Sequence, residues 1–401
     1  MATFRIPLPK ELPEDVCGEI AKRACYCDHA IEGARYVKDG GDLEVVVSPN
    51  CDATAVEVKV RKLIAKMKTE RLAVQPRTLR SRSVSNAAYA SDVFERLCND
   101  EDIRTEGTGI VARGGQFLSF LSELDRFLER LAWAHFRAPV RSYPVLIPSE
   151  WLRRAGYFAS FPHSLTFAMH LGEDYDRLEE FARRHKKGEP VHFNAIEELT
   201  QPEYCLSPAV CYHAYGGLMD RTLAASEGGL RTFTAVGRCF RYESKNITDL
   251  DRLWEFSMRE IVFVGEGPRV LEARERSIEL TWRLVELLDL QAEIATAADP
   301  FFATDFNALR YFQLSNELKF ELQLPVNPER TIACASFNYH EQFFGSRFNV
   351  KTAAGEDVHT GCAAFGLERF VYACLSQLGM SESRRRLRQA EAELLNDAPE
   401  R

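Results

Sequence analysis

The sequence contains no apolar run close to the ~18 to 20 residues that a transmembrane helix needs. Its first residues, 1–16, lack the apolar core and the small-residue cleavage site of a secretory signal. Internal repeats are also absent, and biased composition is confined to a charged segment at the C-terminus. We therefore expect a soluble, cytoplasmic protein without a membrane partner.

A disulfide framework and an excess of positive charge are missing as well. The eleven cysteines are odd in number and irregularly spaced, so we expect most of them to be reduced and buried, with a few available as ligands. The formal net charge of −8 argues against broad, non-specific binding of nucleic acid but allows a local basic patch. With 45% hydrophobic residues among 401, the chain has enough apolar material for one large core and a smaller domain.

The first 90 residues predict a small N-terminal α+β domain. Residues 41–48 have strand character, and residues 52–72 place apolar side chains near helical spacing. Residues 74–90 are polar, basic and contain a proline, which is typical of a linker. The end of the helix and this segment are rich in basic residues, namely Arg61, Lys62, Lys66, Lys68, Arg71, Arg77, Arg80 and Arg82. They form either a solvated face or a docking surface for an acidic partner.

Residues 105–380 predict one larger α+β domain, and residues 381–401 a charged tail. A long amphipathic helix leads into an extended segment that contains Pro144, and four strand-like segments follow. The expected helices cover residues 114–136, 172–186, 268–289 and 366–378, and the strand-like segments lie within 230–244, 259–265, 318–326 and 330–340. Strands clustered in this way, with helices outside them, favour an antiparallel sheet flanked by helices.

Charged and aromatic residues gather around two of these strands. Arg241 and Glu243 flank Tyr242 on a predicted strand, so both side chains would point to one face, either as a structural ion pair or as a ligand clamp. Phe256 follows, with Arg252 four residues before it. An aromatic face, an arginine and an acceptor carboxylate are what a purine triphosphate requires.

Taken in order, these features resemble the three motifs of class II aminoacyl-tRNA synthetases. The long helix before Pro144 matches the first motif, Phe-Arg-x-Glu and the strand after it match the second, and Gly-Leu-Glu-Arg matches the third. The resemblance implies an antiparallel catalytic sheet and a homodimer formed through the first motif. It also implies that Arg241 holds the α-phosphate of ATP, Glu243 the adenine amino group, Phe256 one adenine face, Arg252 the outer phosphates, and Arg369 the γ-phosphate and the other adenine face. Arg241 and Arg369 would be the catalytic pair. Mg²⁺ would accompany ATP, with Glu321 as a candidate ligand.

Two cysteines and one glutamate are candidate metal ligands. Cys211, Glu260 and Cys362 offer two thiolates and a carboxylate, which leave a tetrahedral Zn²⁺ one open position, as in catalytic zinc sites. Either cysteine alone is more typical of a buried core residue. Together the three positions resemble the zinc ligands of the atypical, methanogen-type seryl-tRNA synthetases. In those enzymes the open position takes the α-amino group of the substrate.

The surrounding sequence resembles the bacterial amino acid:carrier protein ligases more closely. The matching stretches include "LSPAVCYHAY", "CFRYES", "FSMREIVFVG" and "HTGCAAFGLERF", and the resemblance spans most of residues 140–375. It implies ATP-dependent activation of a small amino acid, glycine or alanine, as an aminoacyl-adenylate, followed by transfer to the phosphopantetheine thiol of a carrier protein. Asn338, His340 and Asp299 are candidates for the wall of the substrate pocket, with structural roles as the alternative.

The N-terminal residues depart from these carrier ligases, which begin close to the first-motif helix. The additional domain would dock a carrier protein, contact tRNA, or do neither. A seryl-type synthetase that acts on tRNA is therefore an alternative function. A non-catalytic synthetase paralogue is a minor one, because such proteins usually lose motif arginines or metal ligands, and Arg241, Arg369 and both candidate cysteines are present here.

Overall fold

The computed structural model describes residues 2–68, 76–84, 89–90, 92–186, 199–224, 229–247, 249–301 and 306–397. Within these ranges no helix is both long enough and apolar enough to cross a membrane. Arg71 and the side chain of Lys68, both in the basic segment noted above, lie outside the described part of the chain.

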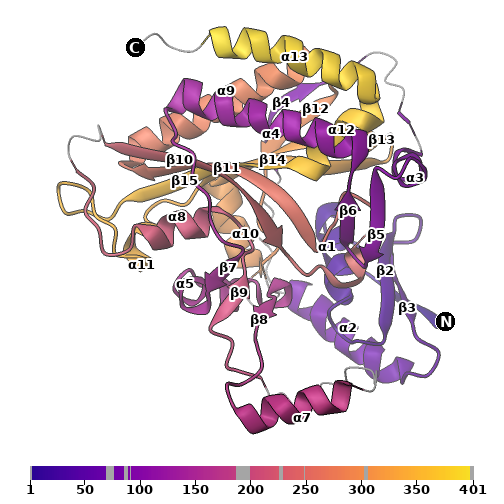
Figure 1. The fold of residues 1–401 in the computed structure, drawn as a ribbon. Helices are drawn as coiled ribbons and strands as arrows, with labels where there is room; N and C mark the ends of the chain where they lie inside the picture. The colour runs from indigo at the N-terminus through magenta and orange to yellow at the C-terminus, as the bar shows by residue number, and fades with distance from the viewer. Residues whose placement is uncertain are drawn as a thin grey trace.

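A seven-stranded sheet forms the centre of the molecule (Figure 1). Its order is β10-β11-β15-β14-β13-β12-β4, and every neighbouring pair is antiparallel. The strands are β10 (Leu230–Phe240), β11 (Glu255–Gly265), β15 (His359–Gly366), β14 (Arg330–Tyr339), β13 (Lys319–Asn327), β12 (Ala292–Thr296) and β4 (Thr78–Arg82). Because side chains alternate along a strand, Ile261 and Phe263 of β11 enter the main core while Glu260 faces the other side. The predicted α+β fold with an antiparallel sheet is confirmed.

Four long helices lie on one side of this sheet, three of them against its face and the last packed on these three (Figure 1). They are α4 (Gly115–Phe136), α9 (Gly267–Leu288), α12 (Leu367–Leu378) and α13 (Met380–Asn396). Their apolar stripes and the inward side chains of the strands form the largest hydrophobic core. The buried side chain of Arg259 on β11 donates to both carboxylate oxygens of Asp125 on α4, at 2.7 and 2.9 Å. This pair fixes the helix predicted as the first motif against the strand that carries Glu260.

The N-terminal residues build a small unit with its own core. Strands β1 (Ala2–Pro7), β3 (Asp42–Val47) and β2 (Ile31–Val37) form a three-stranded antiparallel sheet in the order β1-β3-β2. Helices α1 (Glu14–Ala24) and α2 (Ala53–Lys68) pack on it, and the apolar side of α2 is buried as its spacing predicts. In Figure 1 this unit, coloured indigo, lies on the side of the large sheet opposite the four long helices.

Shorter elements complete the described chain. Strands β5 (Ile103–Gly107) and β6 (Ile110–Arg113) form a hairpin, and β7 (Leu146–Pro148), β9 (Tyr204–Leu206) and β8 (Phe167–Ala168) form a third small sheet. The remaining α-helices are α3 (Val93–Asn99), α5 (Ser149–Arg154), α6 (Tyr157–Ser160), α7 (Tyr175–His185), α8 (Cys211–Gly217), α10 (Phe306–Ser315) and α11 (Phe343–Arg347). Of these, α8 and α11 contact the face of the large sheet that the long helices leave open.

Two sequence expectations are corrected by the fold. The predicted charged tail is helix α13 as far as Asn396, because Leu387, Ala390 and Leu394 recur at helical spacing and are buried against α4 and α9. The predicted linker contains β4, which pairs with β12 at the edge of the large sheet. Three arginines of the basic segment are thereby paired within the larger domain, namely Arg77 with Glu317, Arg80 with Glu279 and Arg82 with Asp289. The other described basic residues of the segment lie on helix α2 in the N-terminal unit.

Candidate active site

A cavity of about 830 Å³ lies on the open face of the large sheet, between that face and the N-terminal unit. It is lined by every residue that the sequence nominated for the site: Cys211, Arg241, Glu243, Arg252, Phe256, Glu260, Asp299, Glu321, Asn338, His340, Cys362 and Arg369. These side chains come from the start of α8, from β11, β13, β14 and β15, from α12, and from the segments after β10, β12 and β14. The fold therefore brings the candidate metal ligands and the candidate nucleotide ligands into one space.

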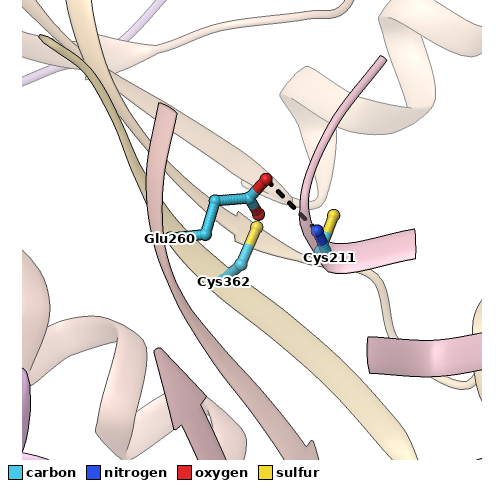
Figure 2. Close-up of side chains that lie close together, drawn as sticks. All are labelled: Cys211, Glu260 and Cys362. Carbon is cyan, nitrogen blue, oxygen red and sulfur yellow. Dashed lines mark hydrogen bonds between the residues drawn. The ribbon is translucent and has the colours of Figure 1, made fainter. Parts of the chain in front are cut away.

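The candidate metal ligands form a compact, buried cluster (Figure 2). Cys211, Glu260 and Cys362 each offer one ligand atom within 4.8 Å of the others, and all three side chains are buried. Glu260 on β11 and Cys362 on β15 lie on the same face of adjacent strands, and Cys211 begins the short helix α8 opposite them. Cys362 lies in the middle of β15.

The polar partners of this cluster orient it for a ligand. One carboxylate oxygen of Glu260 accepts the backbone N–H groups of Val210 and Cys211, at 2.7 and 3.2 Å. The other oxygen, Oε2, is buried without a hydrogen-bond partner among the described residues. Asn338 Nδ2 donates to Cys362 Sγ at 3.3 Å. Two sulfur atoms and one unsatisfied carboxylate oxygen are a donor set suited to Zn²⁺, and all three residues line the cavity.

Burial also sets the protonation of the cluster. A hydrogen bond with Cys362, burial and the neighbouring Glu260 carboxylate raise the pKa of the Cys211 thiol well above its usual value. Burial likewise raises the pKa of Glu260. The Glu260 shift expresses the cost of a negative charge in a dry site, and the Cys211 shift adds the effect of the neighbouring Cys362 and Glu260. A bound divalent cation would reduce both costs.

The candidate nucleotide ligands line the same cavity as the metal-ligand cluster. Arg241 is fixed by a 2.9 Å hydrogen bond from its Nε to the carbonyl of Pro208, and its guanidinium lies 5.5 Å from the centre of the Phe256 ring. Glu243 forms an ion pair with Arg252. Burial would raise the pKa of Glu243, but Arg252 and Arg369 lower it, so the carboxylate is ionised at neutral pH.

The third motif contributes Arg369 from the first turn of α12, as its sequence predicts. Its Nε donates to the carbonyl of Asp251 at 2.5 Å, which orients the guanidinium toward the cavity that it lines. One expectation about the second motif is wrong, because β10 ends at Phe240 and Arg241 and Glu243 follow it in an irregular segment. Both residues still line the same cavity. The irregular segment therefore places both side chains on one side, as strand alternation was expected to do.

A buried carboxylate that the sequence analysis did not identify, Glu368, contacts the backbone beside this cluster. Glu368 is 1% exposed, and its Oε2 accepts the backbone N–H of Ser257 at 2.8 Å, directly after Phe256. Its Oε1 lies 2.9 Å from Nε of Arg113, which is also buried. Because Glu368 precedes Arg369, this contact couples the start of α12 to the position of the aromatic ring. Its place in the Gly-Leu-Glu-Arg run was the available signal.

Lys319 is a second residue that the sequence analysis did not nominate. Its ammonium lies 2.6 Å from Asp299 and 2.9 Å from Glu321, so both candidate carboxylates share one buried cation. Gln313 Nε2 also donates to Asp299 at 2.8 Å. The two carboxylates raise the pKa of Lys319 although burial acts in the opposite direction. The alternation of Lys319, Glu321 and Gln323 with apolar residues on β13 was the signal that placed these side chains on the cavity face.

His340 and Asn338 close the cavity near the metal-ligand cluster. Burial lowers the pKa of His340 to about 4, so the imidazole is neutral at physiological pH. Its Nδ1 lies 3.2 Å from the Thr360 hydroxyl and 3.5 Å from the Tyr215 hydroxyl. A neutral imidazole and an amide make a polar wall without a net charge.

The comparison with protein families identifies the domain that carries this site. Residues 193–378 match the model of the tRNA synthetase class II core domain (G, H, P, S and T). The seryl-tRNA synthetase of Methanopyrus kandleri, solved in complex with a tRNASec from A. aeolicus, superposes with a TM-score of 0.69 over 99% of this chain and 79% of that one, at 22% identity. The cytoplasmic serine–tRNA ligase of Naegleria fowleri gives a TM-score of 0.58 over 81% of this chain and 67% of that one, at 12% identity. Both solved synthetases therefore share the fold of this chain.

The curated relatives are more informative. Amino acid–acyl-carrier-protein ligase 1 of Bradyrhizobium diazoefficiens is 33% identical over 294 residues, which cover 73% of this chain and 86% of that protein. The chain belongs to the amino acid–acyl-carrier-protein ligase family. Ligase 2 of the same organism is 35% identical over 239 residues, or 58% of this chain and 68% of that protein. The enzyme is accordingly a ligase with a class II synthetase core, as the sequence motifs predicted.

The ligase covers a smaller share of the tRNA-specific relatives than of the two carrier-protein ligases. The type-2 serine–tRNA ligase of Methanopyrus kandleri is 29% identical over 59% of this chain. The ligase spans 47% of the length of that relative, so the two proteins correspond over about half of the synthetase.

Proposed function

We propose that the ligase uses ATP to activate a small amino acid as its aminoacyl-adenylate and then transfers the aminoacyl group to the phosphopantetheine thiol of a carrier protein. One observation carries this proposal: a single cavity is lined both by the Cys211–Glu260–Cys362 cluster and by the arginines and aromatic ring expected for ATP. The carrier-protein ligases among the relatives support the choice of acceptor. Glycine or alanine is the proposed substrate.

ATP binding accounts for the five charged and aromatic residues in the middle of the cavity. Arg241 would hold the α-phosphate, Phe256 would stack on the adenine, and Glu243 would accept its amino group. Arg252 and Arg369 would neutralise the outer phosphates, which frees Glu243 from its present partner Arg252. The carboxylate oxygen of the amino acid would attack the α-phosphorus, and pyrophosphate would leave with the electrons of the broken P–O bond. Positioning and charge neutralisation supply the catalysis of such a step, with Mg²⁺ accompanying ATP.

Zn²⁺ is the proposed metal of the buried cluster, and Cys211, Glu260 and Cys362 would hold it. Bound there, it would supply a Lewis-acidic position for the unprotonated amine of the substrate. This chemistry suits a substrate whose side chain offers nothing to grip, because selection then depends on the amine, the carboxylate and the exclusion of larger groups. Asn338, His340 and Asp299 would form the wall that excludes them.

Amino-acid-dependent exchange of pyrophosphate into ATP tests the first half-reaction. We expect exchange with glycine or alanine to exceed that with every larger amino acid, because the proposed wall of Asn338, His340 and Asp299 would exclude larger side chains. Exchange should be measured with each of the twenty amino acids and without any of them. Absence of exchange in the whole panel would contradict the proposal.

Transfer to tRNA is the second candidate function, and the type-2 serine–tRNA ligases among the relatives favour it. Serine would then give the strongest exchange, and labelled serine would appear on tRNA in a ribonuclease-sensitive form. A non-catalytic role is disfavoured because all the candidate ATP and metal ligands line the cavity.

We also propose that two ligase chains form a homodimer at the first motif. Apolar side chains are exposed where the end of α4 meets the edge strand β10: Trp133 is 54% exposed, Val140 53% and Val236 39%. Val140 also pairs with Thr234 of β10, so these residues border the free edge of the large sheet. Such a border would be covered by the partner chain.

Sedimentation velocity tests the dimer. The parent should sediment as a dimer, and the double variant Trp133→Glu/Val140→Glu as a folded monomer, because buried unpaired carboxylates oppose association. Val58→Glu is the matched control, since Val58 is 62% exposed on α2 and should leave the dimer intact. A monomeric parent, or a double variant with the parent's sedimentation coefficient, would reject this interface.

A further inference from the structure

The N-terminal unit contributes a basic border to the cavity. From α1 and α2 the cavity is lined by the cations Lys22, Arg23, Lys59, Lys62 and Lys66 and by one carboxylate, Glu19. Glu19 pairs with Lys22 and Arg23 on its own helix. Lys62 and Lys66 are exposed, whereas the metal-ligand cluster is buried, so the cavity opens to solvent beside α2. In a chain with a net charge of −8, this border is a local positive field.

The lysines of α2 lie at helical spacing on one side of that helix. Lys59, Lys62 and Lys66 are separated by three and four residues, and Leu63 between them also lines the cavity. The other side of α2 is buried in the core of the N-terminal unit. Lys59 pairs with Asp28, whereas Lys62 has no ion pair or side-chain hydrogen bond within the part of the chain that the structure describes. The apolar packing of α2 therefore holds these ammonium groups at the cavity border.

The position of α2 is fixed relative to the proposed ATP site. The segment directly after Arg241 contacts the N-terminal unit through several polar bonds. Asn246 Nδ2 donates to the carbonyl of Lys22 at 2.9 Å, the Ser244 hydroxyl donates to the carbonyl of Cys25 at 3.3 Å, and Lys245 pairs with Glu32 at 2.9 Å. The Tyr26 hydroxyl donates to the carbonyl of Tyr242 at 3.3 Å. The same segment thus supplies the proposed nucleotide ligands and anchors the unit that carries the lysines.

We propose that Lys62 and Lys66 receive the phosphate of the acceptor's phosphopantetheine arm as its thiol enters the cavity, and that an acidic carrier protein docks against α2. This inference rests on the proposed function and names the binding site of its acceptor. The candidate ligands of the triphosphate, Arg241, Arg252 and Arg369, line the same cavity, so the lysines of α2 would bind a second phosphate group rather than ATP. An acidic carrier surface complements an exposed basic helix face and would accelerate docking at low salt.

The transfer step itself balances without another reactant. The thiol sulfur of the arm attacks the carbonyl carbon of the aminoacyl-adenylate, and a C–S bond forms as the C–O bond to the phosphate breaks. AMP leaves with the electrons of that bond, and the thiol proton passes to solvent. Holding the phosphate of the arm at Lys62 and Lys66 orients the sulfur toward the adenylate, which raises the rate through positioning.

Two small thiols test the phosphate site without a known carrier. The ratio of kcat/KM for pantetheine 4′-phosphate to that for pantetheine should be well above one in the parent. It should fall at least tenfold in Lys62→Glu/Lys66→Glu, because carboxylates would repel the phosphate. The control Lys10→Glu/Lys38→Glu makes the same charge change on the same unit away from the cavity and should keep the parent's ratio. A phosphopantetheinylated acyl carrier protein should show the same loss as the phosphorylated thiol.

Three results would overturn the inference. An unchanged ratio in the Lys62/Lys66 variant would show that the lysines do not bind the phosphate of the arm. A loss of pyrophosphate exchange as large as the loss of transfer would show that they serve ATP instead. A selective loss of tRNA aminoacylation in the same variant would assign α2 to RNA. Pyrophosphate exchange by the parent is measured in parallel, and its absence would reject the proposed function itself rather than the role of α2 alone.

Discussion

Replacement of Arg241 by alanine is expected to reduce amino-acid-dependent pyrophosphate exchange at least about a hundredfold, the usual cost of removing one preorganised charge from a reacting phosphate. The guanidinium lies over Phe256 and is held by the carbonyl of Pro208, so it is oriented before ATP arrives. Arg241→Lys should recover only a part of this loss, because an ammonium group keeps the charge but loses the planar contact with the ring and the fixed Nε bond. Initial rates at saturating ATP and glycine or alanine measure both variants.

Arg153→Ala is the matched control for this experiment. Arg153 lies on α5, pairs with Glu150 on the surface and does not line the cavity, so its loss should leave exchange at the parent's rate. Circular dichroism and zinc content should match the parent in all three variants, which separates a catalytic defect from unfolding. Exchange in Arg241→Ala within threefold of the parent would contradict the role assigned to Arg241.

The second large effect is expected at the metal cluster. Cys362→Ala should lower the zinc content of the purified ligase from about one equivalent per chain to less than a tenth of that, because two remaining ligands hold a catalytic zinc weakly. Pyrophosphate exchange should fall with the zinc content. Elemental analysis by plasma mass spectrometry and exchange rates on the same preparations measure both quantities.

Cys374→Ala provides a control with the same chemistry at a different place. Cys374 is a free, buried cysteine on α12 that does not line the cavity. Its replacement removes one thiol and leaves a small cavity in the core, so stability should fall slightly while zinc content stays at the parent's value. Undiminished zinc in Cys362→Ala would reject the assignment of the cluster, whatever the exchange rate.

Part of the site could be predicted because it is encoded locally. The Gly-Leu-Glu-Arg run places Arg369 in the first turn of a helix. The alternation of side chains along β11 places Glu260 on the face opposite Ile261 and Phe263. The proximity of Cys211 and Cys362 is not local, since they lie 151 positions apart in the sequence and only the meeting of α8 with the large sheet joins them. Their selection from eleven cysteines depended on family resemblance.

The incorrect expectations arose where long-range packing overrides composition. Leu387, Ala390 and Leu394 recur at helical spacing in α13, but the many charged residues around them led to the prediction of a charged tail. Strand β4 has five residues, two of them arginine, and it exists because β12 offers a free edge. No local pattern indicates that α2 lies beside the cavity, because that placement depends on contacts between α1 and the segment after Arg241.

The central proposal is that one cavity joins amino-acid activation to transfer onto a carrier thiol, and a single labelling experiment tests it most directly. The ligase is incubated with ATP, Mg²⁺ and labelled glycine or alanine, together with an acyl carrier protein in its phosphopantetheinylated or its unmodified form. We predict acid-stable, hydroxylamine-sensitive label on the phosphopantetheinylated carrier alone, unaffected by ribonuclease. Label on tRNA in place of the carrier, or no difference between the two forms of the carrier, would contradict the proposal.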